Sequence, residues 1–270
     1  MKRKPGVKSQ ESGGRRIVVK IGTSLFQESS VFTPKYIASI VDDIVNIRKN
    51  GIEVIIVSSG AIGCGMRAFG IAEYPKTIQE RQALASIGQP LLMELYKSLF
   101  GNYDIVISQI LLTHNELFGK KSSFNILNTF SSLFKFGVIP IVNENDSVST
   151  EEVKIGDNDT LSSHLAILLN ASCLIILTDS DGVYKLNKNK FSKVIPVISE
   201  ITDEIKGFIK EKRSKNTIGG MKTKIESAKM CIEQGIPAII ASGKKEKTLK
   251  KILAGKREGT LFLPKKWEEL

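Results

Sequence analysis

Short runs of β-branched residues alternate along this chain with longer segments whose apolar residues recur at helical spacing. The first run, Ile17–Ile21, precedes Thr33 and Pro34, which are typical of a helix N-cap and of the first helical position. Apolar residues then recur every three or four positions until Gly51, a residue type that commonly follows a helix end. This region is therefore expected to form one strand followed by one helix.

The same succession of strand and helix continues along the rest of the sequence. Because strands that are joined through helices lie parallel in one sheet, it predicts the α/β class, with a mainly parallel sheet covered by helices on both faces. A short β-excursion is also expected at Glu152–Ile155. Further strands are expected at Val54–Val57, Ile105–Leu111, Val138–Val142, Leu174–Leu177 and Ala238–Ile240, and further helices over Lys76–Phe100, Phe124–Phe136, Leu161–Asn170, Met221–Gln234 and Glu246–Leu253.

Length and composition favour one globular domain. The chain has 270 residues, 41% of them hydrophobic, and shows no internal repeat. Residues 1–15 are polar and rich in glycine, so we expect a flexible basic tail there and a single domain at 16–270. No apolar stretch is long enough to span a bilayer or to act as a secretory signal, and the three widely spaced cysteines suit reduced thiols. These features predict a cytoplasmic protein.

The formal net charge of +11 raises the question of an acidic partner such as a nucleic acid. Residues 1–16 and 244–270 each carry a net charge of +5, which leaves +1 for the residues between them. Binding patches usually lie on a folded face, so this distribution favours solvated ends over a nucleic-acid site. A basic nucleic-acid-binding regulator stays open as the less favoured alternative.

The segment VVKIGTS, at residues 18–24, places a lysine at the end of a strand and a glycine in the turn that follows. Strand side chains alternate between faces, so Lys20 can point over the sheet edge towards a ligand. Its ammonium group would then neutralise phosphate charge, while the amides of Gly22, Thr23 and Ser24 donate to oxygen atoms. The alternative is an ordinary surface lysine before a loop.

The segment IVSSGAIGCG, at residues 56–65, contains part of the glycine pattern of dinucleotide-binding proteins, since GxGxxA begins at Gly63. That pattern should follow its strand directly, yet five residues separate Val57 from Gly63, and no strand ending in an acid comes next. A dinucleotide-dependent oxidoreductase is therefore disfavoured. We favour an anion-binding turn in which the Ser59 hydroxyl and nearby amides meet a carboxylate or phosphate, with a plain strand-to-helix turn as the alternative.

Carboxylates and amides are densest at residues 143–159, in the segments NENDSV and IGDND. Such groups after a buried strand can bind an ammonium group, orient lysines or face a metal. Asn, Asp and Gly are also ordinary turn formers and helix caps, and Asp159 can simply cap the next helix. The acidic candidates are Asp146, Asp157 and Asp159, and the amide candidates are Asn143, Asn145 and Asn158.

Two segments of the C-terminal half are suited to a nucleotide. In LTDSDGVY, Thr178 and Asp179 follow a strand, where nucleotides contact an open sheet, although Asp-Gly also suits a plain turn. In IGGMKTK, two glycines precede a helix that carries Lys222 and Lys224 in its first turn. Cations at that end oppose the helix dipole, so a phosphate partner is expected nearby.

Several familiar catalytic arrangements are absent from the sequence. There is no GxxxxGK(S/T) phosphate loop and no HRD or DFG segment of a protein kinase. The two histidines, His114 and His164, lack the spacing of a metal site, and no nucleophile–histidine pair stands out. The chemistry is therefore expected to need neither a histidine base nor metal-ligating residues of the protein.

Taken in order, these segments resemble the amino acid kinase family, and within it the glutamate 5-kinases. The resemblance covers residues 16–263, and NENDSV with IGDND and GGMKTK is specific to this branch rather than to the kinases for aspartate, acetylglutamate, carbamate or UMP. It implies an open αβα sandwich around a mainly parallel sheet. It further implies that the amino acid binds over the N-terminal half and ATP over the C-terminal half.

The resemblance also implies roles for individual residues. Lys20 and Lys224 match the lysines that stabilise the transferring phosphoryl group, and Asp159 matches the aspartate that orients them. The glutamate-binding positions are matched by Ser59, Asp146 and Asn158, with Asp157 beside them. The ATP-binding positions are matched by Lys20, Thr178, Asp179, Ile218, Gly219, Gly220, Met221, Lys222, Thr223 and Lys224.

The implied reaction is the phosphorylation of the side-chain carboxylate of L-glutamate by ATP with Mg²⁺, which gives L-glutamyl 5-phosphate and opens proline biosynthesis. Homo-oligomers and a reductase that receives the product are expected, whereas a membrane or a nucleic acid is not. Two features depart from the resemblance: many relatives carry a C-terminal domain of the PUA type, whereas this sequence stops at Leu270, and the basic N-terminal extension has no counterpart. A kinase for aspartate or N-acetylglutamate is the nearest alternative.

Overall fold

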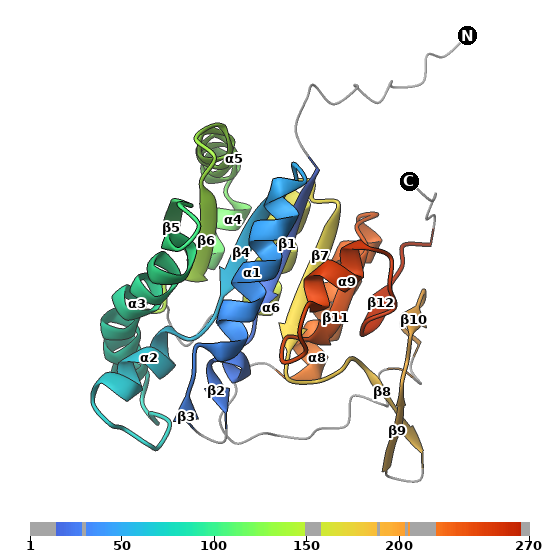
Figure 1. Cartoon of the computed structure of the whole chain (residues 1–270), viewed down its shortest axis with the longest axis horizontal. Coiled ribbons are helices and arrows are strands. Elements are labelled where there is room, and N and C mark those ends of the chain that lie inside the picture. Colours follow the sequence, from blue (N-terminus) through green and yellow to red (C-terminus); the bar gives the residue numbers. More distant parts are fainter. Residues whose placement is uncertain are drawn as a thin grey trace.

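An eight-stranded sheet forms the centre of the molecule in the computed structural model, which describes residues 15–28, 31–148, 158–187, 190–202, 205 and 220–265 (Figure 1). The strand order is β10-β12-β11-β7-β1-β4-β6-β5. Most of the expected tail and the β-excursion expected at Glu152–Ile155 lie outside the described residues. The strands of this sheet are β1 (Arg16–Ile21), β4 (Glu53–Ser58), β5 (Ile107–Leu112), β6 (Ile139–Glu144), β7 (Cys173–Thr178), β10 (Val197–Ile198), β11 (Ala238–Ser242) and β12 (Thr260–Phe262).

Pairing within the sheet is parallel throughout, except between β11 and β12. The expected α/β class with a mainly parallel sheet is therefore confirmed. The sequence analysis missed β10 and β12, which are only two and three residues long. It also missed two small antiparallel ribbons, one of β2 (Gln27–Glu28) with β3 (Val31–Phe32) and one of β8 (Tyr184–Asn187) with β9 (Lys190–Val194).

Helices cover both faces of the sheet because side chains alternate along each strand. Val19 of β1 belongs to the buried cluster under α1, α2, α3 and α9, whereas Val18 belongs to the cluster under α5, α6 and α8. In Figure 1, α1 and α9 lie in front of the sheet and α6 and α8 behind it. The helices are α1 (Lys35–Lys49), α2 (Ala61–Ala68), α3 (Ile78–Gly101), α4 (His114–Phe118), α5 (Lys120–Lys135), α6 (Asn158–Leu168), α8 (Met221–Glu233) and α9 (Thr248–Leu253), with a short 3₁₀ turn η1 (Thr23–Phe26).

The start and end of α1 follow the signals in the sequence. The Thr33 hydroxyl accepts a hydrogen bond from the Lys35 amide at 3.3 Å, and Pro34 already has helical backbone angles. At the other end, Gly51 has a φ of 76°, which favours glycine. The N-cap residue of helix α9 makes no side-chain capping bond. Instead, the buried Asp43 of α1 accepts hydrogen bonds from two amides in the first turn of α9, at 3.0 and 3.3 Å.

Of the two glycines that suggested a dinucleotide pattern, Gly65 serves helix packing, as does Gly88 on the facing helix. Gly63 and Gly65 lie inside α2 rather than in the turn before it. A Cβ atom on Gly65 would come 2.1 Å from the Leu84 carbonyl oxygen of α3, and one on Gly88 would come 1.8 Å from the Ala61 carbonyl oxygen of α2. The two helices therefore touch backbone to backbone at these points, which only glycine permits.

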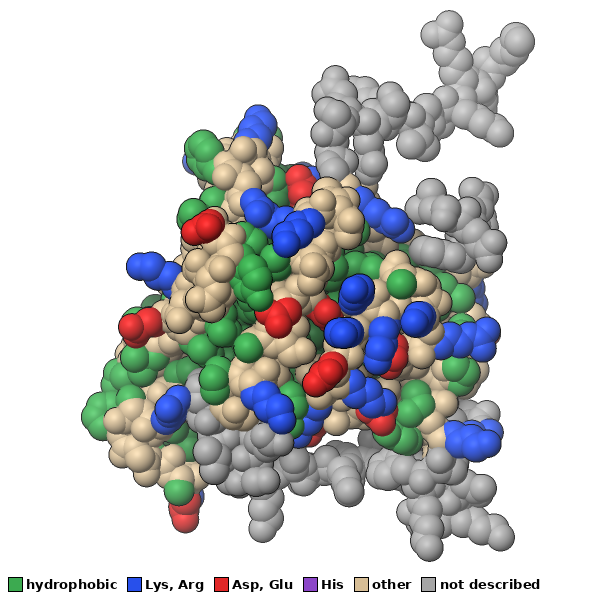
Figure 2. Space-filling view, in the orientation of Figure 1, with side chains coloured by type: hydrophobic (Ala, Val, Ile, Leu, Met, Phe, Trp, Pro, Cys, Tyr) green, Lys and Arg blue, Asp and Glu red, His purple; other side chains and the backbone are tan. Residues whose placement is uncertain are grey.

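Exposed lysines gather on the face that carries α9 (Figure 2). Lys244, Lys245, Lys247 and Lys250 are all exposed there. That these charges are only solvated, without an acidic partner, stays a prediction. Across the described ranges, none of the helices combines the length and the apolar character needed to cross a membrane.

Candidate functional site

Lys20 lies in the middle of the sheet, one residue before the end of β1 and between β7 and β4. The alternation of strand side chains puts it on the same face as Val18, under α6 and α8. The residue is only 4% exposed, so it is not a surface lysine. Its ammonium group needs a buried partner of opposite charge.

That partner is Asp159, on the first turn of α6. One carboxylate oxygen lies 2.7 Å from Lys20 Nζ, and the other lies 2.9 Å from Lys224 Nζ, which comes from the first turn of α8. The Thr223 hydroxyl donates to this second oxygen at 2.9 Å. Asp159 is fully buried, and Lys224 is 7% exposed. The structure thus brings together the three residues to which the family resemblance gave catalytic roles.

The charges of this cluster favour the binding of an anion. Burial by itself would raise the pKa of Asp159, but Lys20 and Lys224 outweigh it and hold this pKa well below its ordinary value. Among the described side chains of the cluster, one carboxylate therefore faces two ammonium groups. The surplus positive charge, on side chains that are almost fully buried, is suited to phosphate oxygens.

Two helices begin at the same edge of the sheet with glycine in the N-cap position. The N-caps of α2 and α8 are Gly60 and Gly220, and neither makes a side-chain capping bond. Gly60 has a φ of 118°, a conformation that other residues rarely adopt. The N-cap residues thus leave the first-turn amide groups of both helices to other acceptors, such as an oxygen-rich ligand, and the anion-binding role expected for the glycine segments stays a prediction.

Asn158 links the strand ends of β4 and β6. Its amide nitrogen donates to the Ser59 hydroxyl at 3.0 Å and to the Asn143 side-chain oxygen at 2.8 Å. The neighbouring Ser58 is held by a 2.8 Å hydrogen bond between its hydroxyl and that of the fully buried Tyr96. The predicted substrate residues Ser59 and Asn158 are thus in contact. The sequence noted Asn143 without giving it a role, and nothing in it pointed to Tyr96.

Asp146 follows β6 and is half-buried. Burial raises the pKa of its carboxyl to about 6. Burial also raises the pKa of Tyr74, in the connection between α2 and α3. The charge of Arg81 lowers this pKa and the charge of Asp146 raises it. A carboxylate with this environment gains from a positively charged ligand.

Of the remaining predicted residues, some lie near the sheet edge, one points away from the site, and three lie outside the described residues. Thr178 and Asp179 lie at the end of β7, where the Thr178 hydroxyl donates to the Asp179 carboxylate at 3.1 Å. Met221 begins α8 and is half-buried. The side chain of Lys222 is 73% exposed and lies 4.0 Å from Glu226 on its own helix, away from Asp159. Asp157, Ile218 and Gly219 lie outside the described residues.

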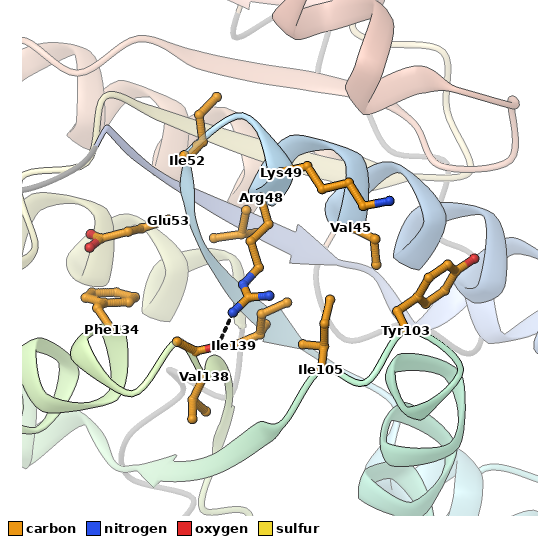
Figure 3. Close-up of a pocket in the computed structure, with 13 residues that line it drawn as sticks. Val45, Arg48, Lys49, Ile52, Glu53, Tyr103, Ile105, Phe134, Val138 and Ile139 are labelled. Atoms are coloured by element: carbon orange, nitrogen blue, oxygen red, sulfur yellow. Dashed lines mark hydrogen bonds between the residues drawn. The ribbon is translucent and has the colours of Figure 1, made fainter.

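A cavity of about 410 Å³ lies at the opposite edge of the sheet (Figure 3). It is lined by Glu53 and Ile139, the first residues of β4 and β6, and by Arg48, which donates to the Gly137 carbonyl oxygen. None of the predicted site residues lines it. Within the described ranges, no three His, Cys, Asp or Glu side chains form a group that could hold a metal ion.

Comparison with known proteins gives one consistent result. Residues 15–242 match the model of the amino acid kinase family. The chain is 45% identical to the glutamate 5-kinase of Clostridium acetobutylicum over 94% of this chain and 96% of that protein, and 45% identical to that of a Thermoanaerobacter species over 93% and 68%. The fold is similar to that of a UMP kinase from Bacillus anthracis, with a TM-score of 0.62 at 17% identity over 94% of this chain and 98% of that chain. The chain therefore belongs to the amino acid kinase family, and within it to the glutamate 5-kinases.

Proposed function

We propose that this protein transfers the γ-phosphoryl group of ATP to the side-chain carboxylate of L-glutamate, as the first step of proline biosynthesis. The observation that carries the proposal is the convergence of Lys20 and Lys224 on Asp159 at the carboxyl edge of the sheet. It is supported by the relatives named glutamate 5-kinase, which match most of the chain. We further expect the protein to act in the cytoplasm, to form homo-oligomers and to supply its acyl phosphate product to a reductase.

The two substrates are assigned to different halves of the sheet edge. Glutamate would lie over β4 and β6, where Ser59, Asn158 and Asp146 are found. ATP would lie over β7 and β11, next to Thr178 and the first turn of α8. Lys20 comes from the strand between these halves, so it is placed where the two substrates would meet.

The reaction needs no general base. A glutamate side chain has a pKa of about 4.3, so near neutral pH it arrives as a carboxylate. One of its oxygens attacks the γ-phosphorus, a P–O bond forms, and the bond to the β,γ-bridging oxygen breaks to release ADP. The barrier comes chiefly from bringing an anion onto a polyanion.

The protein lowers that barrier by positioning positive charge. Lys20 and Lys224 would contact the transferring group, and Asp159 holds both ammonium groups in place before the substrates bind. The amides of the first turns of α2 and α8 add further donors. We propose that Mg²⁺ is held mainly by the ATP phosphates, where it neutralises charge on the leaving and transferred groups.

The direct test is glutamate-dependent release of ADP in the presence of Mg²⁺, with hydroxylamine to trap the acyl phosphate as a hydroxamate. We expect L-glutamate to be the preferred acceptor in a panel with L-aspartate and N-acetyl-L-glutamate. Acetylation removes the α-ammonium charge and would leave Asp146 without its partner. A preference for aspartate or acetylglutamate, or the lack of any acceptor-dependent ADP release, would overturn the proposal.

The pH dependence of glutamate use tests the role of Asp146. Its pKa is raised to about 6, so the carboxyl becomes protonated, and unable to pair with the α-ammonium group, as the pH falls through that value. We therefore expect kcat/KM for glutamate to fall below about pH 6, because this quantity reports the groups of the enzyme before glutamate binds. The measurement is a pH series from 5 to 8 at saturating ATP, with kcat/KM for ATP recorded in parallel.

Asp146→Ala is the control for this assignment. It should raise KM for glutamate at least about tenfold, change KM for ATP by less than about twofold and remove the acidic limb of the glutamate profile. Equal effects on both substrates, or an acidic limb that persists in the variant, would show that another group titrates.

A further inference from the structure

Three side-chain amides form a chain of hydrogen bonds from α3 to α6. Gln89 of α3 accepts at its Oε1 atom from the amide nitrogen of Asn143, at 2.8 Å. Asn143, at the end of β6, accepts in turn from the amide nitrogen of Asn158, which also donates to Ser59. Gln89 is therefore tied, through Asn143, to the residues assigned to glutamate.

One backbone group determines which side chain donates and which accepts in each of these hydrogen bonds. The Glu144 amide N–H donates to Asn143 Oδ1 at 2.9 Å, and a backbone N–H cannot act as an acceptor. Asn143 must therefore turn its oxygen to Glu144 and its NH₂ group to Gln89. Gln89 must in turn present its oxygen to Asn143, which leaves its Nε2 atom on the other side of the amide group.

Nε2 of Gln89 is buried and has no hydrogen-bond partner among the described residues. The whole residue is only 9% exposed. Leaving a buried donor without an acceptor is costly, so proteins rarely keep one that no partner satisfies. The ligand group that fits is an acceptor, and beside a site for an amino acid that acceptor is a carboxylate.

The order of the strands indicates which carboxylate of glutamate this is. Strands β1, β4 and β6 are neighbours, and a spacing of about 4.8 Å puts the end of β6 roughly 10 Å from that of β1. The side-chain carboxylate must lie near Lys20, on β1, so the α-carbon lies towards β6. Asp146, which we assign to the α-ammonium group, follows β6 as well.

We propose that Gln89 Nε2 donates a hydrogen bond to the α-carboxylate of the amino acid, and so selects substrates that carry this group. The inference rests on the proposed function. It gives the protein a recognition group for each charged group at the α-carbon of glutamate, Asp146 for the ammonium group and Gln89 for the α-carboxylate. Lys20 and Lys224 act instead on the transferring phosphoryl group.

The test compares two substrates on two variants. 4-Aminobutyrate keeps the reacting carboxylate and the ammonium group of glutamate but lacks the α-carboxylate. Gln89→Met removes both the donor and the acceptor, whereas Gln89→Glu removes the donor and keeps an acceptor for Asn143. We expect kcat/KM for glutamate to fall at least about tenfold in both variants, and kcat/KM for 4-aminobutyrate to stay within about twofold.

An equal loss for both substrates would overturn the proposal, because Gln89 would then act only by supporting Asn143. No loss for either substrate would overturn it as well. If Gln89→Met does not fold, Gln89→Glu carries the comparison, and if 4-aminobutyrate releases no ADP, its inhibition constant against glutamate replaces kcat/KM. Failure of the proposed function is a separate result, since the wild-type protein would then show no glutamate-dependent ADP release.

Discussion

Replacing Lys224 by alanine should lower kcat at least about a hundredfold, because loss of one donor to the transferring group typically costs roughly 3–4 kcal/mol of transition-state stabilisation. Lys20→Ala should have an effect of the same size. Each variant leaves Asp159 with one buried lysine and with the Thr223 hydroxyl, so the ion pair survives in part and the fold should persist. Steady-state kinetics with glutamate and ATP varied in turn give the measurement.

Lys229→Ala is the matched control on the same helix. The Lys229 side chain is 51% exposed and lies 3.6 Å from Glu233, one turn along α8, so its loss should change kcat by less than about twofold. The assignment is wrong if Lys224→Ala retains nearly the wild-type kcat. It is also wrong if only KM for ATP rises, because the ammonium group would then bind ground state and transition state equally.

The sequence predicted the central part of the sheet well because local and long-range preferences agree there. The apolar runs of β1, β4 and β7 have all or nearly all of their residues buried, as expected of interior parallel strands. The glycine at position 51 predicted the end of α1, and the structure explains why, because Gly51 has a positive φ that other residues rarely adopt. The periphery was harder to predict. Strand β12 has three residues and owes its place to pairing with β11, which no local pattern encodes.

Helix α2 was missed for a related reason. Its residues, AIGCGMRA, include two glycines, which lower helix propensity. Gly65 is nevertheless required, because any side chain there would meet the Leu84 carbonyl oxygen of α3. Packing against α3 therefore outweighs local propensity. In the sequence alone, such a glycine cannot be told from one in a ligand-binding turn.

The candidate site was predictable where charge or motif gave a signal. Lys224 was predicted because a lysine in the first turn of a helix opposes the helix dipole. Lys20 was predicted because it lies at the end of a buried strand. Gln89 gave no such signal, since a lone glutamine inside a helix has no local consequence. Its importance depends on Asn143, 54 positions away in the sequence, and on the backbone amide that orients the pair.

Asp159→Asn should destabilise the protein more than any other single change at the site. It leaves two buried ammonium groups without the carboxylate that joins them, and breaking a buried pair in this way costs about 3–5 kcal/mol. For a chain of this length each kcal/mol shifts Tm by about 2–4 °C, so Tm should fall by on the order of 10 °C. Differential scanning calorimetry at pH 7 without nucleotide is the measurement.

Nucleotide should restore part of this loss, because phosphate oxygens can replace the missing carboxylate. We therefore expect saturating ATP with Mg²⁺ to raise Tm further in Asp159→Asn than in the wild-type protein, provided that the variant still binds the nucleotide. The matched control is Asp181→Asn, which breaks an exposed 2.9 Å pair with Lys245 and should cost less than about 1 kcal/mol.

The pH dependence of stability separates this account from a simple packing defect. Folding lowers the pKa of Asp159, so its contribution is present above its unfolded pKa of about 4 and is lost as the pH falls below that value. The stability difference between wild type and Asp159→Asn should therefore be constant from pH 6 to 8 and shrink in acid. A difference that stays the same at low pH would mean that asparagine disturbs packing rather than charge, and Asp159 would lose its role as the anchor of both lysines.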